Sequence, residues 1–581
     1  MPESSIPELL RNAAARFGDR LALRQPHGHD VHTWTWSQYL AAAEEIAAGL
    51  QALGLRKGEH IAICSETRAE FYLVDQGILA AGCVAAALYP SYPPAELLRT
   101  IDLSDARALF VEDARTLTKL KDAPVEHLVL MTGDLPGNAP AHAVTLAALR
   151  KHGRYRAELG PGDNAILYLT SGATGEPKMV IVTHGSIYSN IQMGPAVLPL
   201  TQDDITIAFL PSAHIAQRVV VEILPILSGS PVSFAESLLK LAGEMKTVQP
   251  TWFLAPPRVW ERIYTSIRAE IQKRPALLQR AIFGALGLGL AAARRKREGQ
   301  SVPPHIRVPL DLAHKLVFRK IRDRFGGRLR IAASGAAPLG KDLAEFYEAI
   351  GMPLIEGYGL TEGGVCAFNP LDAARPGSIG KALPNVQFQV SDDGELLIKA
   401  PCLSSGYYKD PVATADLIRD GWLHTGDIGM VDSYGYIYIT GRSKELIVSS
   451  NGKKIYPSRV EAFFKLDPLI SQVVLAGDNL PHLVALMTIN VAVAKEISGA
   501  AEPLHESAAV HAAVQKIVSR VNKQLAPFEQ VRRFRILPRE FTIEHGEVTA
   551  TMKVRRRQVM GNFKADLDAL YHLSASGRGG E

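Results

Sequence analysis

The sequence predicts an α/β protein with a large N-terminal body of stacked αβ layers, a β-rich subdomain within that body, and a small, mobile C-terminal α+β domain. Three observations lead to this prediction. The chain has 581 residues, more than one compact core usually holds. Apolar strand-like runs alternate with helix-like stretches along most of it, which indicates parallel sheets covered by helices. The pattern changes after residue 380 and again after residue 441.

The elements of the body follow in order along the chain. A helix is expected over 36–54, because apolar residues recur there at helical spacing and the stretch ends at a glycine. Short apolar runs bounded by polar or turn residues predict buried strands. These runs cover 58–66, 108–113, 163–171, 204–211, 230–236, 251–256, 329–335 and 352–359.

A β-rich subdomain is expected over about 380–440. Strand-like runs at 387–400 and 435–440 contain or adjoin Asp-Gly and Tyr-Gly turns, which are typical of antiparallel hairpins. The next segment, 441–446, is polar and lies between two strand-like runs, so the hinge between domains is expected there.

The chain is therefore divided into an N-terminal body over 1–440, a C-terminal domain over 447–572 and a disordered tail over 573–581. Within the C-terminal domain, strands are expected near 482–491 and 534–541, and a helix is expected near 509–524.

Charge and cysteine content exclude several classes of function. The chain has 64 Lys and Arg against 59 Asp and Glu, and a net charge of +5 on a protein of this size does not indicate nucleic-acid binding. Its four cysteines form no CxxC pair, so neither a disulfide scaffold nor a cysteine zinc site is expected. The N-terminus lacks the apolar core of a signal peptide. These features predict a cytoplasmic protein.

One apolar run leaves a peripheral membrane contact open. Residues 282–293, IFGALGLGLAAA, fall short of the roughly 18 apolar residues that a spanning helix needs, and four basic residues follow at 294–297. Such a segment either rests on a bilayer as an amphipathic surface element or forms a helix packed on the body with a solvated basic end. Periodicity alone does not separate these two interpretations.

A strand that runs into a turn rich in glycine and hydroxyl groups is the first candidate for chemistry. Residues 167–178 read LYLTSGATGEPK. Glycines in such a turn let backbone N–H groups approach phosphate oxygens, hydroxyls add donors, and Lys178 adds a compact positive charge. A second stretch, 335–341, misses the P-loop motif because Asp342 replaces its Ser or Thr and Pro338 lies inside it, so a plain strand-to-helix turn is expected there.

The first of these loops resembles the signature of a known superfamily. TSGATGEPK, followed by THGS at 183–186, is similar to the phosphate loop of the adenylate-forming (AMP-binding) superfamily, which includes acyl-CoA synthetases, luciferases and peptide-synthetase adenylation domains. Five further motifs resemble those of the superfamily and keep its order. They are SGAAPL at 334–339, GYGLTE at 357–362, GWLHTGD at 421–427, GRSK at 441–444 and TMKVR at 551–555.

The long-chain acyl-CoA synthetase branch of the superfamily is the best match. DGWLHTGDIG resembles the fatty-acid signature of that branch, and LPSAHIAQRVVVE, APPRVWERIY and VTATMK are similar to its sequences. The resemblance implies activation of a long-chain fatty acid or other bulky apolar carboxylic acid. Its carboxylate attacks the α-phosphate of ATP to give acyl-AMP and pyrophosphate, and the thiol of coenzyme A then displaces AMP.

Two alternatives to an acyl-CoA synthetase remain open. An acyl-AMP ligase would hand the acyl group to a carrier protein. A non-catalytic acyl- or membrane-binding protein would keep the fold, but the intact residues Thr361, Glu362, Asp427 and Lys553 argue against it. The expected partners are thus a carboxylic acid, ATP, Mg²⁺ and coenzyme A, without nucleic acid, and a homodimer is left open.

The resemblance also implies roles for individual residues. Lys553 would stabilise negative charge between the carboxylate and the α-phosphate, which Thr361 would contact. Glu362 would ligate Mg²⁺ with the Thr170 hydroxyl nearby, and His214 would position the acyl carboxylate. The residues implied to bind ATP or AMP are Thr170, Ser171, Gly172, Ala173, Thr174, Gly175, Lys178, Gly335, Ala336, Ala337, Glu356, Gly357, Tyr358, Gly359, Thr361, Asp427, Ile439 and Arg442.

Within that set, Tyr358 would stack on adenine, Asp427 would accept both ribose hydroxyls and Arg442 would assist at the ribose. Lys444 resembles the pivot about which the C-terminal domain of the superfamily rotates between the two reactions. The rotation would bring a second loop to the thiol of coenzyme A. Its residues are Ser450, Asn451, Gly452, Lys453 and Lys454.

Several of these residues also have a purely structural interpretation. Lys553 precedes three arginines and could belong to a solvated basic face, and His214 could be a structural histidine. Trp252, Arg258 and Trp260 fit either a ligand tunnel or the core equally well. The phosphate loop departs from the superfamily pattern at two positions, where Met179 replaces a glycine and Ala173 replaces a common threonine.

Overall fold

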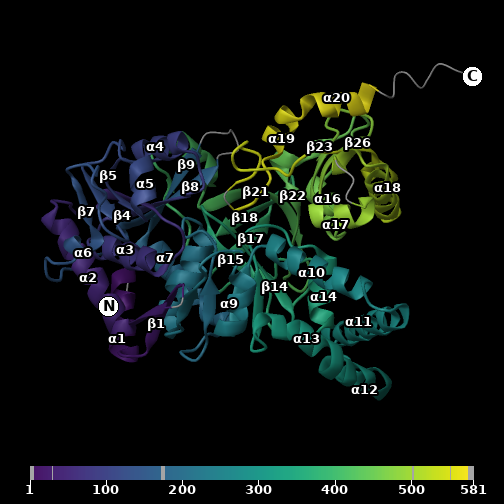
Figure 1. The fold of residues 1–581 in the computed structure, drawn as a ribbon, viewed down its shortest axis with the longest axis horizontal. Coiled ribbons are helices and arrows are strands. Elements are labelled where there is room, and N and C mark those ends of the chain that lie inside the picture. The colour runs from purple at the N-terminus through teal and green to yellow at the C-terminus, as the bar shows by residue number, and fades with distance from the viewer. Residues whose placement is uncertain (1–4, 29, 172–176, 500–502, 550, 573–581) are drawn as a thin grey trace, which may run out of the picture.

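A computed structural model describes residues 5–28, 30–171, 177–499, 503–549 and 551–572 (Figure 1). It is a mixed α/β protein with a large N-terminal body and a smaller C-terminal domain, which confirms the predicted fold class (Figure 1). The predicted phosphate-loop residues Gly172, Ala173, Thr174 and Gly175 and the predicted disordered tail lie outside the described residues.

The largest sheet has eight strands and forms the first layer of the body. Its strands are parallel from β8 through β7 and antiparallel at the β8–β9–β19 edge. Consecutive buried alanines in β4 let helices approach closely. In order across the sheet, the strands are β19 (Gly406–Tyr407), β9 (Pro177–Thr183), β8 (Asn164–Ser171), β4 (Val84–Leu88), β3 (His60–Cys64), β5 (Ala106–Val111), β6 (His127–Leu130) and β7 (Ala143–Thr145).

Helices cover this sheet as the alternating sequence pattern predicted. The main ones are α2 (Trp36–Ala52) and α3 (Ala69–Ala80), and Gly77 of α3 lies so near Ile46 of α2 that an added Cβ would be 2.5 Å from its side chain. Smaller helices complete the layer: α4 (Pro94–Leu103), α5 (Ala114–Lys119), α6 (Leu146–Leu149) and α7 (His184–Met193).

Two further sheets extend the body. One has the order β10-β11-β1-β2, and the other β12-β13-β14-β15-β16. The strands of the first are β10 (Thr206–Ala208), β11 (Val232–Phe234), β1 (Leu21–His27) and β2 (Asp30–Thr35), and those of the second are β12 (Trp252–Ala255), β13 (Ile331–Ser334), β14 (Leu354–Leu360), β15 (Gly364–Phe368) and β16 (Lys381–Ala382).

The predicted β-rich subdomain is an antiparallel sheet with the order β17-β18-β21-β20, in which β22 also pairs with β21. Its strands are β17 (Gln387–Val390), β18 (Glu395–Lys399), β21 (Trp422–Val431), β20 (Ile418–Arg419) and β22 (Ile437–Arg442). Helix α15 (Pro411–Leu417) precedes β20. Figure 1 shows this sheet at the centre of the molecule, facing the C-terminal domain.

The C-terminal domain has its own cores on both sides of a three-stranded sheet. The sheet consists of β25 (Ile470–Ala476), β26 (Leu483–Ile489) and β27 (Val531–Ile536). The surrounding elements are the hairpin β23 (Ile447–Val448) and β24 (Lys454–Ile455), and helices α16 (Pro457–Lys465), α17 (Val491–Ser498), α18 (Ala508–Asn522), α19 (Arg556–Asn562) and α20 (Lys564–His572).

A helical insert projects from the body between β12 and β13 (Figure 1). Its helices are α10 (Pro257–Gln272), α11 (Ala276–Arg297), α12 (Pro304–Ala313), the π-helical η3 (His314–Phe318) and α13 (Arg319–Arg322). Helix α14 (Lys341–Ala349), which follows β13, supports it. The turn from β13 to α14 is the plain strand-to-helix connection predicted for 335–341.

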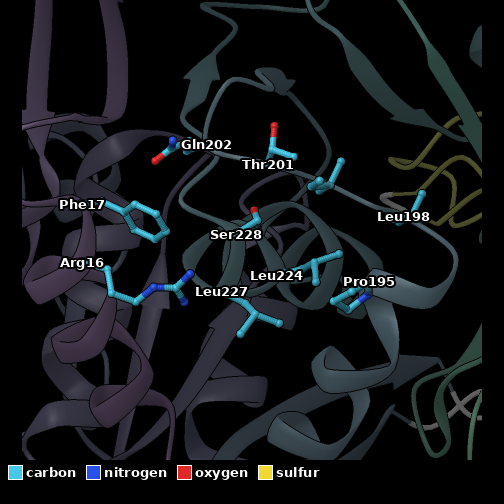
Figure 2. Close-up of a pocket in the computed structure, with 10 residues that line it drawn as sticks. Arg16, Phe17, Pro195, Leu198, Thr201, Gln202, Leu224, Leu227 and Ser228 are labelled. Atoms are coloured by element: carbon cyan, nitrogen blue, oxygen red, sulfur yellow. The ribbon is translucent and has the colours of Figure 1, made fainter.

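At the N-terminal end of the body, a pocket of about 420 Å³ opens between three segments (Figure 2). It is lined by Phe17 of α1 (Ile6–Phe17), by Leu224 and Leu227 of α8 (Leu224–Ser228), and by the loop around Leu198. None of its lining residues was predicted to act in binding or catalysis.

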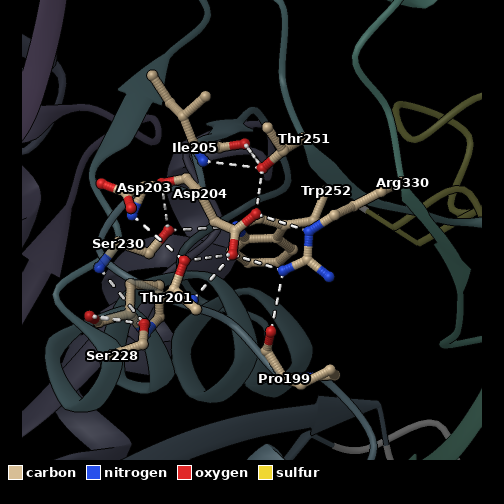
Figure 3. A network of polar contacts seen from close by, with 11 residues as sticks. Pro199, Thr201, Asp203, Asp204, Ile205, Ser228, Ser230, Thr251, Trp252 and Arg330 are labelled. Carbon is tan, nitrogen blue, oxygen red and sulfur yellow. Dashed lines mark hydrogen bonds and ion pairs between the residues drawn. The ribbon is translucent and has the colours of Figure 1, made fainter.

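Beside this pocket, a buried carboxylate joins the second and third sheets (Figure 3). Asp204 accepts hydrogen bonds from Thr251 Oγ1 at 2.7 Å and Thr201 N at 2.8 Å, and it also pairs with Arg330. Burial alone would raise the pKa of Asp204, but these donors outweigh it and lower the pKa to about 2. The network fixes the start of β12 against the start of β13.

Candidate active site

The centre of the site is a carboxylate that two neighbouring strands and a tyrosine hold in place. Asp427 on β21 lies opposite Arg442 on β22 in the antiparallel register, and Arg442 Nε donates to Asp427 Oδ1 at 3.0 Å. The Tyr358 hydroxyl on β14 donates to Asp427 Oδ2 at 2.6 Å. Asp427 is only 3 % exposed. Because each oxygen keeps a free lone pair, the carboxylate can still accept a bond from a ligand hydroxyl.

The local sequence around Asp427 fixes its direction. The Thr425 hydroxyl accepts from Asp427 N at 3.0 Å, and Gly426 N donates to Glu395 of β18 at 2.7 Å. Burial, together with the adjacent Asp427 charge, raises the pKa of Tyr358 well above its usual value. The tyrosine hydroxyl therefore remains protonated and continues to donate to Asp427.

Glu362 lies in the turn between β14 and β15. That turn is tight, since a Cβ added at Gly359 would lie 2.3 Å from the Gly364 carbonyl oxygen. The Tyr407 hydroxyl of β19 donates to Glu362 Oε1 at 2.8 Å. Thr361 occupies the same turn and is half-buried.

The positive charge of the phosphate loop is held on its C-terminal side. Lys178 Nζ pairs with Asp410 at 2.9 Å and lies 4.8 Å from the centre of the Tyr407 ring. Thr170, at the other end of the loop, donates to the Lys178 carbonyl at 3.3 Å. A cavity of about 570 Å³ opens beside Tyr407 and Asp410, and α15 forms its other side. Lys178 thus carries a compact positive charge at the end of the loop, of the kind that binds phosphate.

The predicted adenine loop connects β13 to α14. Ala336 adopts the left-handed backbone region, with φ of 69°, which is unusual for a residue with a side chain and is often found at binding sites. Behind the loop, Glu356 is buried and accepts from Leu339 N at 2.9 Å. Burial raises the pKa of Glu356 to about 8, and the Leu339 N–H opposes part of that rise. Glu356 thus shapes the loop from behind, while the predicted residues Gly335, Ala337, Gly357 and Ile439 lie on the neighbouring strands and turns.

Lys553 stands on a tight turn of the C-terminal domain. Thr549 N donates to the Lys553 carbonyl at 2.8 Å, Lys553 N donates to Thr549 Oγ1 at 3.1 Å, and Met552 has a left-handed φ of 63°. The residue keeps access to solvent, but desolvation of its ammonium by the surrounding protein and the nearby Arg442 lower its pKa to about 8. The carboxylates of Asp427, Glu362 and Glu445 act in the opposite direction. The charge of Lys553 therefore lies within reach of the body's carboxylate cluster.

Two of the three arginines after Lys553 contact protein, whereas the solvated basic face considered as an alternative would leave them in water. Arg556 pairs with the buried Glu461 at 2.7 Å and donates to the Leu475 carbonyl at 2.9 Å. Arg555 lies 6.0 Å from the centre of the Tyr92 ring, on the body. The turn that carries Lys553 is therefore anchored immediately downstream.

His214 follows β10 and lies three residues before the π-helix η2 (Gln217–Ile223). Its Nδ1 accepts from Ala216 N at 3.2 Å. Burial and the positive charge of Lys553 lower the pKa of His214 to about 3, so the imidazole is neutral at physiological pH. The charge of Lys553, from the C-terminal domain, thus acts on an imidazole of the body.

The predicted coenzyme A loop lies apart from this cluster, in the β23–β24 hairpin. Ser450 N donates to Leu480 O at 3.0 Å, Lys453 N to Ser449 Oγ at 3.2 Å, and Lys453 Nζ lies 6.0 Å from the Phe528 ring centre. These contacts are all within the C-terminal domain. Asn451, Gly452 and Lys454 belong to the same hairpin, and Lys444 lies exposed on the short helix Ser443–Glu445 that leads into it.

Trp252, Arg258 and Trp260 were expected either in a ligand tunnel or in the core, and two of them lie in the core. Trp252 and Trp260 are both completely buried. Arg258 instead crosses to the C-terminal domain, where its guanidinium donates to the Ser471 carbonyl and to Ser471 Oγ. It is a contact between domains.

Tyr407, Asp410 and Glu445 were not predicted as site residues. Tyr407 and Asp410 reach the site because β19 pairs with β9, more than two hundred residues earlier in the chain. The only local signal was the run of aromatic and charged residues in GYYKD at 406–410. Glu445 follows the predicted pivot directly, and proximity to Lys444 was the one available signal.

No cluster of three or more His, Cys, Asp or Glu that could hold a metal occurs among the residues with described positions. Glu362 offers one carboxylate, which accepts a hydrogen bond from Tyr407 and, among the described residues, from no other side chain. This fits Mg²⁺, which commonly binds one or two protein carboxylates and completes its shell with substrate phosphates and water.

Comparisons with known proteins agree with this arrangement. A family model described as AMP-binding enzyme matches residues 10–408, and one described as AMP-binding enzyme C-terminal domain matches residues 444–575. Among curated relatives, the long-chain-fatty-acid–CoA ligase FadD15 of Mycobacterium bovis is 32 % identical over 562 residues, covering 93 % of each chain. The human long-chain-fatty-acid–CoA ligase ACSBG2 is 28 % identical over 98 % of this chain and 92 % of its own.

Solved structures show the same architecture. The adenylation domain of a carboxylate reductase from Mycobacterium chelonae has a TM-score of 0.81 at 22 % identity, covering 98 % of this chain and 92 % of its own. At that identity the likeness concerns the fold alone. The two family models together cover most of the chain, and the chain belongs to the AMP-binding enzyme family.

Proposed function

We propose that this enzyme is an ATP-dependent acyl-CoA synthetase that activates a long-chain fatty acid or another bulky apolar carboxylic acid through an acyl-AMP intermediate. The observation that carries the proposal is the Asp427 carboxylate, which Tyr358 and Arg442 hold in place and whose charge acts on Lys553 of the other domain. The names of the curated relatives support the thioester product and the substrate class.

In the first reaction the body would hold the nucleotide. Asp427 would accept the ribose hydroxyls, with Arg442 and Tyr358 keeping its carboxylate in place. Lys178 would exchange part of its contact with Asp410 for the phosphates of ATP. Glu362 and the Thr170 hydroxyl would supply oxygen ligands to the Mg²⁺ that accompanies ATP.

The chemistry brings an anionic carboxylate to a polyanion, so the site must neutralise charge and align the reactants. Lys553 would place its ammonium between the acyl carboxylate and the α-phosphate, where negative charge develops. The neutral His214 imidazole adds no positive charge and would orient the carboxylate beside Lys553.

In the second reaction the C-terminal domain would rotate about Lys444. Lys553 would leave the site and the 450–454 hairpin would approach the entering thiol, with Lys453 and Lys454 attracting the phosphates of coenzyme A. The thiol sulfur would then attack the acyl carbonyl carbon and lose its proton to water. The bond from that carbon to the phosphate oxygen would break, and its electron pair would leave with AMP. Such alternation lets one site serve two reactions in turn.

A second candidate function is an acyl-AMP ligase that loads a carrier protein. The fold-level likeness to a carboxylate reductase adenylation domain is compatible with it. The acceptor distinguishes the two candidates, because only the synthetase forms free acyl-CoA.

The test is a panel of carboxylic acids, from short aliphatic through long-chain to polycyclic, scored by AMP release with and without coenzyme A. The proposal expects AMP release that depends on coenzyme A, with a thioester product detected by mass spectrometry and a preference for long apolar acids. Pyrophosphate exchange with fatty acids, without any thioester, would overturn the synthetase assignment and favour the carrier-loading ligase.

We further propose a cytoplasmic location with peripheral contact to a membrane. Four buried free cysteines support a reducing compartment. After fractionation of cells, we expect the protein in both the soluble and the carbonate-extractable membrane fractions.

The enzyme is either a monomer or a homodimer. Sedimentation of the purified protein distinguishes the two.

A further inference from the structure

The helical insert presents apolar side chains to solvent on a single stripe. Val308, Leu312 and Leu316 follow one another at four-residue spacing on α12 and η3, and their exposed fractions are 67 %, 57 % and 60 %. Side chains at this spacing lie on the same side of a helix. We call these three residues the α12 stripe.

The neighbouring helix α11 also exposes apolar side chains. Leu277, Leu278 and Phe283 near its start are 80 %, 44 % and 43 % exposed. By length and composition, α11 is the one helix in the described part of the chain that could cross a membrane, and only 22 % of its most apolar window is buried. An exposed apolar helix of this kind needs a partner that covers it.

Positive charge surrounds the apolar side chains. Residues 273–322 contain twelve Lys and Arg and two Asp and Glu, a net charge of +10, while the whole chain has +5. The rest of the protein is therefore net negative, and the insert is a local basic patch. Lys315, Arg319 and Lys320, beside and beyond the α12 stripe, are exposed and have no ion pair with any residue of described position.

The body holds α11 along its C-terminal half, which excludes a spanning arrangement for this folded state. Gly289 lies directly on α14, where an added Cβ would be 2.1 Å from the Ala349 carbonyl oxygen. Arg297 pairs with Glu348 at 2.6 Å. Figure 1 shows the insert projecting at the lower right, with α12 at its outer end and away from the C-terminal domain. The insert can thus meet a flat surface while the rest of the body stays in water.

We propose that the α12 stripe and its basic flanks dock this protein on the surface of an anionic lipid bilayer. An amphipathic helix with apolar residues on one side and Lys and Arg beside them binds at the headgroup boundary, where apolar burial and attraction to anionic lipids add together. Charge complementarity selects a membrane with anionic lipids as the occupant. The inference rests on the peripheral membrane contact proposed above and names the surface that makes it, whereas it does not depend on the ligase activity.

The experiment is flotation of the full-length protein with vesicles of phosphatidylcholine alone and of phosphatidylcholine mixed with phosphatidylglycerol, in the absence of ATP, acid and coenzyme A. The wild-type protein is expected to float with the anionic vesicles, and added salt is expected to reduce the bound fraction. Leu312→Glu/Leu316→Glu should lower binding about tenfold. Lys315→Glu/Arg319→Glu/Lys320→Glu should remove the preference for anionic vesicles, since each basic residue near such a surface contributes about 1 kcal/mol.

Leu239→Glu is the matched control, because Leu239 is 96 % exposed on a different loop. It should float like the wild type, and every variant should adenylate a soluble medium-chain acid at the wild-type rate. The proposal is overturned if the wild-type protein binds neither kind of vesicle. It is also overturned if Leu312→Glu/Leu316→Glu binds vesicles as tightly as the Leu239→Glu control. It is likewise overturned if Leu312→Glu/Leu316→Glu converts a dimer to a monomer without changing vesicle binding, because the stripe would then be a contact between copies of the chain.

Discussion

The body and the C-terminal domain hold their candidate site residues in different ways. On the body, Asp427 accepts from Tyr358 and Arg442, and Glu362 accepts from Tyr407. On the C-terminal domain, backbone bonds fix the Lys553 turn, and among the described residues no hydrogen bond or ion pair holds the lysine ammonium. The body side is preorganised before any ligand binds, whereas the lysine can leave without breaking a specific bond.

Among the substitutions that test this difference, Lys553→Ala should reduce activity most. Removing a charge aimed at a developing anion typically costs two to three orders of magnitude in rate, so overall acyl-CoA formation should fall about a thousandfold. Steady-state AMP release measures the loss. The exposed Lys564→Ala variant, from the same domain, should retain wild-type activity; equal losses in both variants would argue for a structural defect.

Asp427→Ala tests the preorganised side. It removes the carboxylate that both Tyr358 and Arg442 contact, and charge-assisted hydrogen bonds contribute about 1.5–3 kcal/mol each. We expect kcat/KM for ATP to fall about a hundredfold, mainly through KM. Asp392→Ala, at an exposed turn of the same subdomain, is the control. An unchanged KM for ATP would remove Asp427 from the nucleotide site.

Tyr407→Phe has a smaller expected effect and tests a residue that only the structure revealed. The variant keeps the ring beside Lys178 and loses the hydroxyl that donates to Glu362. Loss of one such bond should raise KM for Mg²⁺-ATP about fivefold. Tyr408→Phe removes a neighbouring hydroxyl that bonds Asp105 instead, and its KM should equal that of the wild type.

Asp204→Asn should leave activity unchanged and lower stability. The native pKa of Asp204, about 2, lies below the roughly 3.9 of an unfolded chain. A lowered native pKa stabilises the fold above the unfolded value, and this contribution disappears as pH falls toward the native one. The variant should therefore unfold more easily than the wild type by about 2 kcal/mol at pH 7. The difference should shrink between about pH 4 and pH 2, as thermal unfolding at several pH values will show; a constant difference would contradict the assignment.

The body was largely predictable from sequence because buried strands leave continuous apolar runs. The stretches 58–66 and 108–113 became β3 and β5, and the 36–54 pattern became α2. The apolar run at 282–293 was a less complete guide, since α11 begins six residues earlier, directly after Pro275, and continues through the four basic residues. Helix ends depend on capping and on neighbouring elements, which apolar periodicity does not encode.

The site was predictable where one local motif holds several of its residues. Tyr358, Thr361 and Glu362 share one strand and turn, and Asp427 and Arg442 share a hairpin, so short motifs marked them. Tyr407 and Asp410 enter through pairing of strands that are distant in sequence. The left-handed backbone at Ala336 and Met552 was not visible either, because neither residue type favours that conformation.

The most direct test of the account separates the two half-reactions in the Lys553→Ala variant. If Lys553 serves adenylation and then leaves, acyl-AMP formation should fall about a thousandfold, while conversion of preformed acyl-AMP and coenzyme A to acyl-CoA should proceed near the wild-type rate. Equal loss of both half-reactions, or adenylation at the wild-type rate, would contradict the central claim that this lysine acts in the first reaction alone.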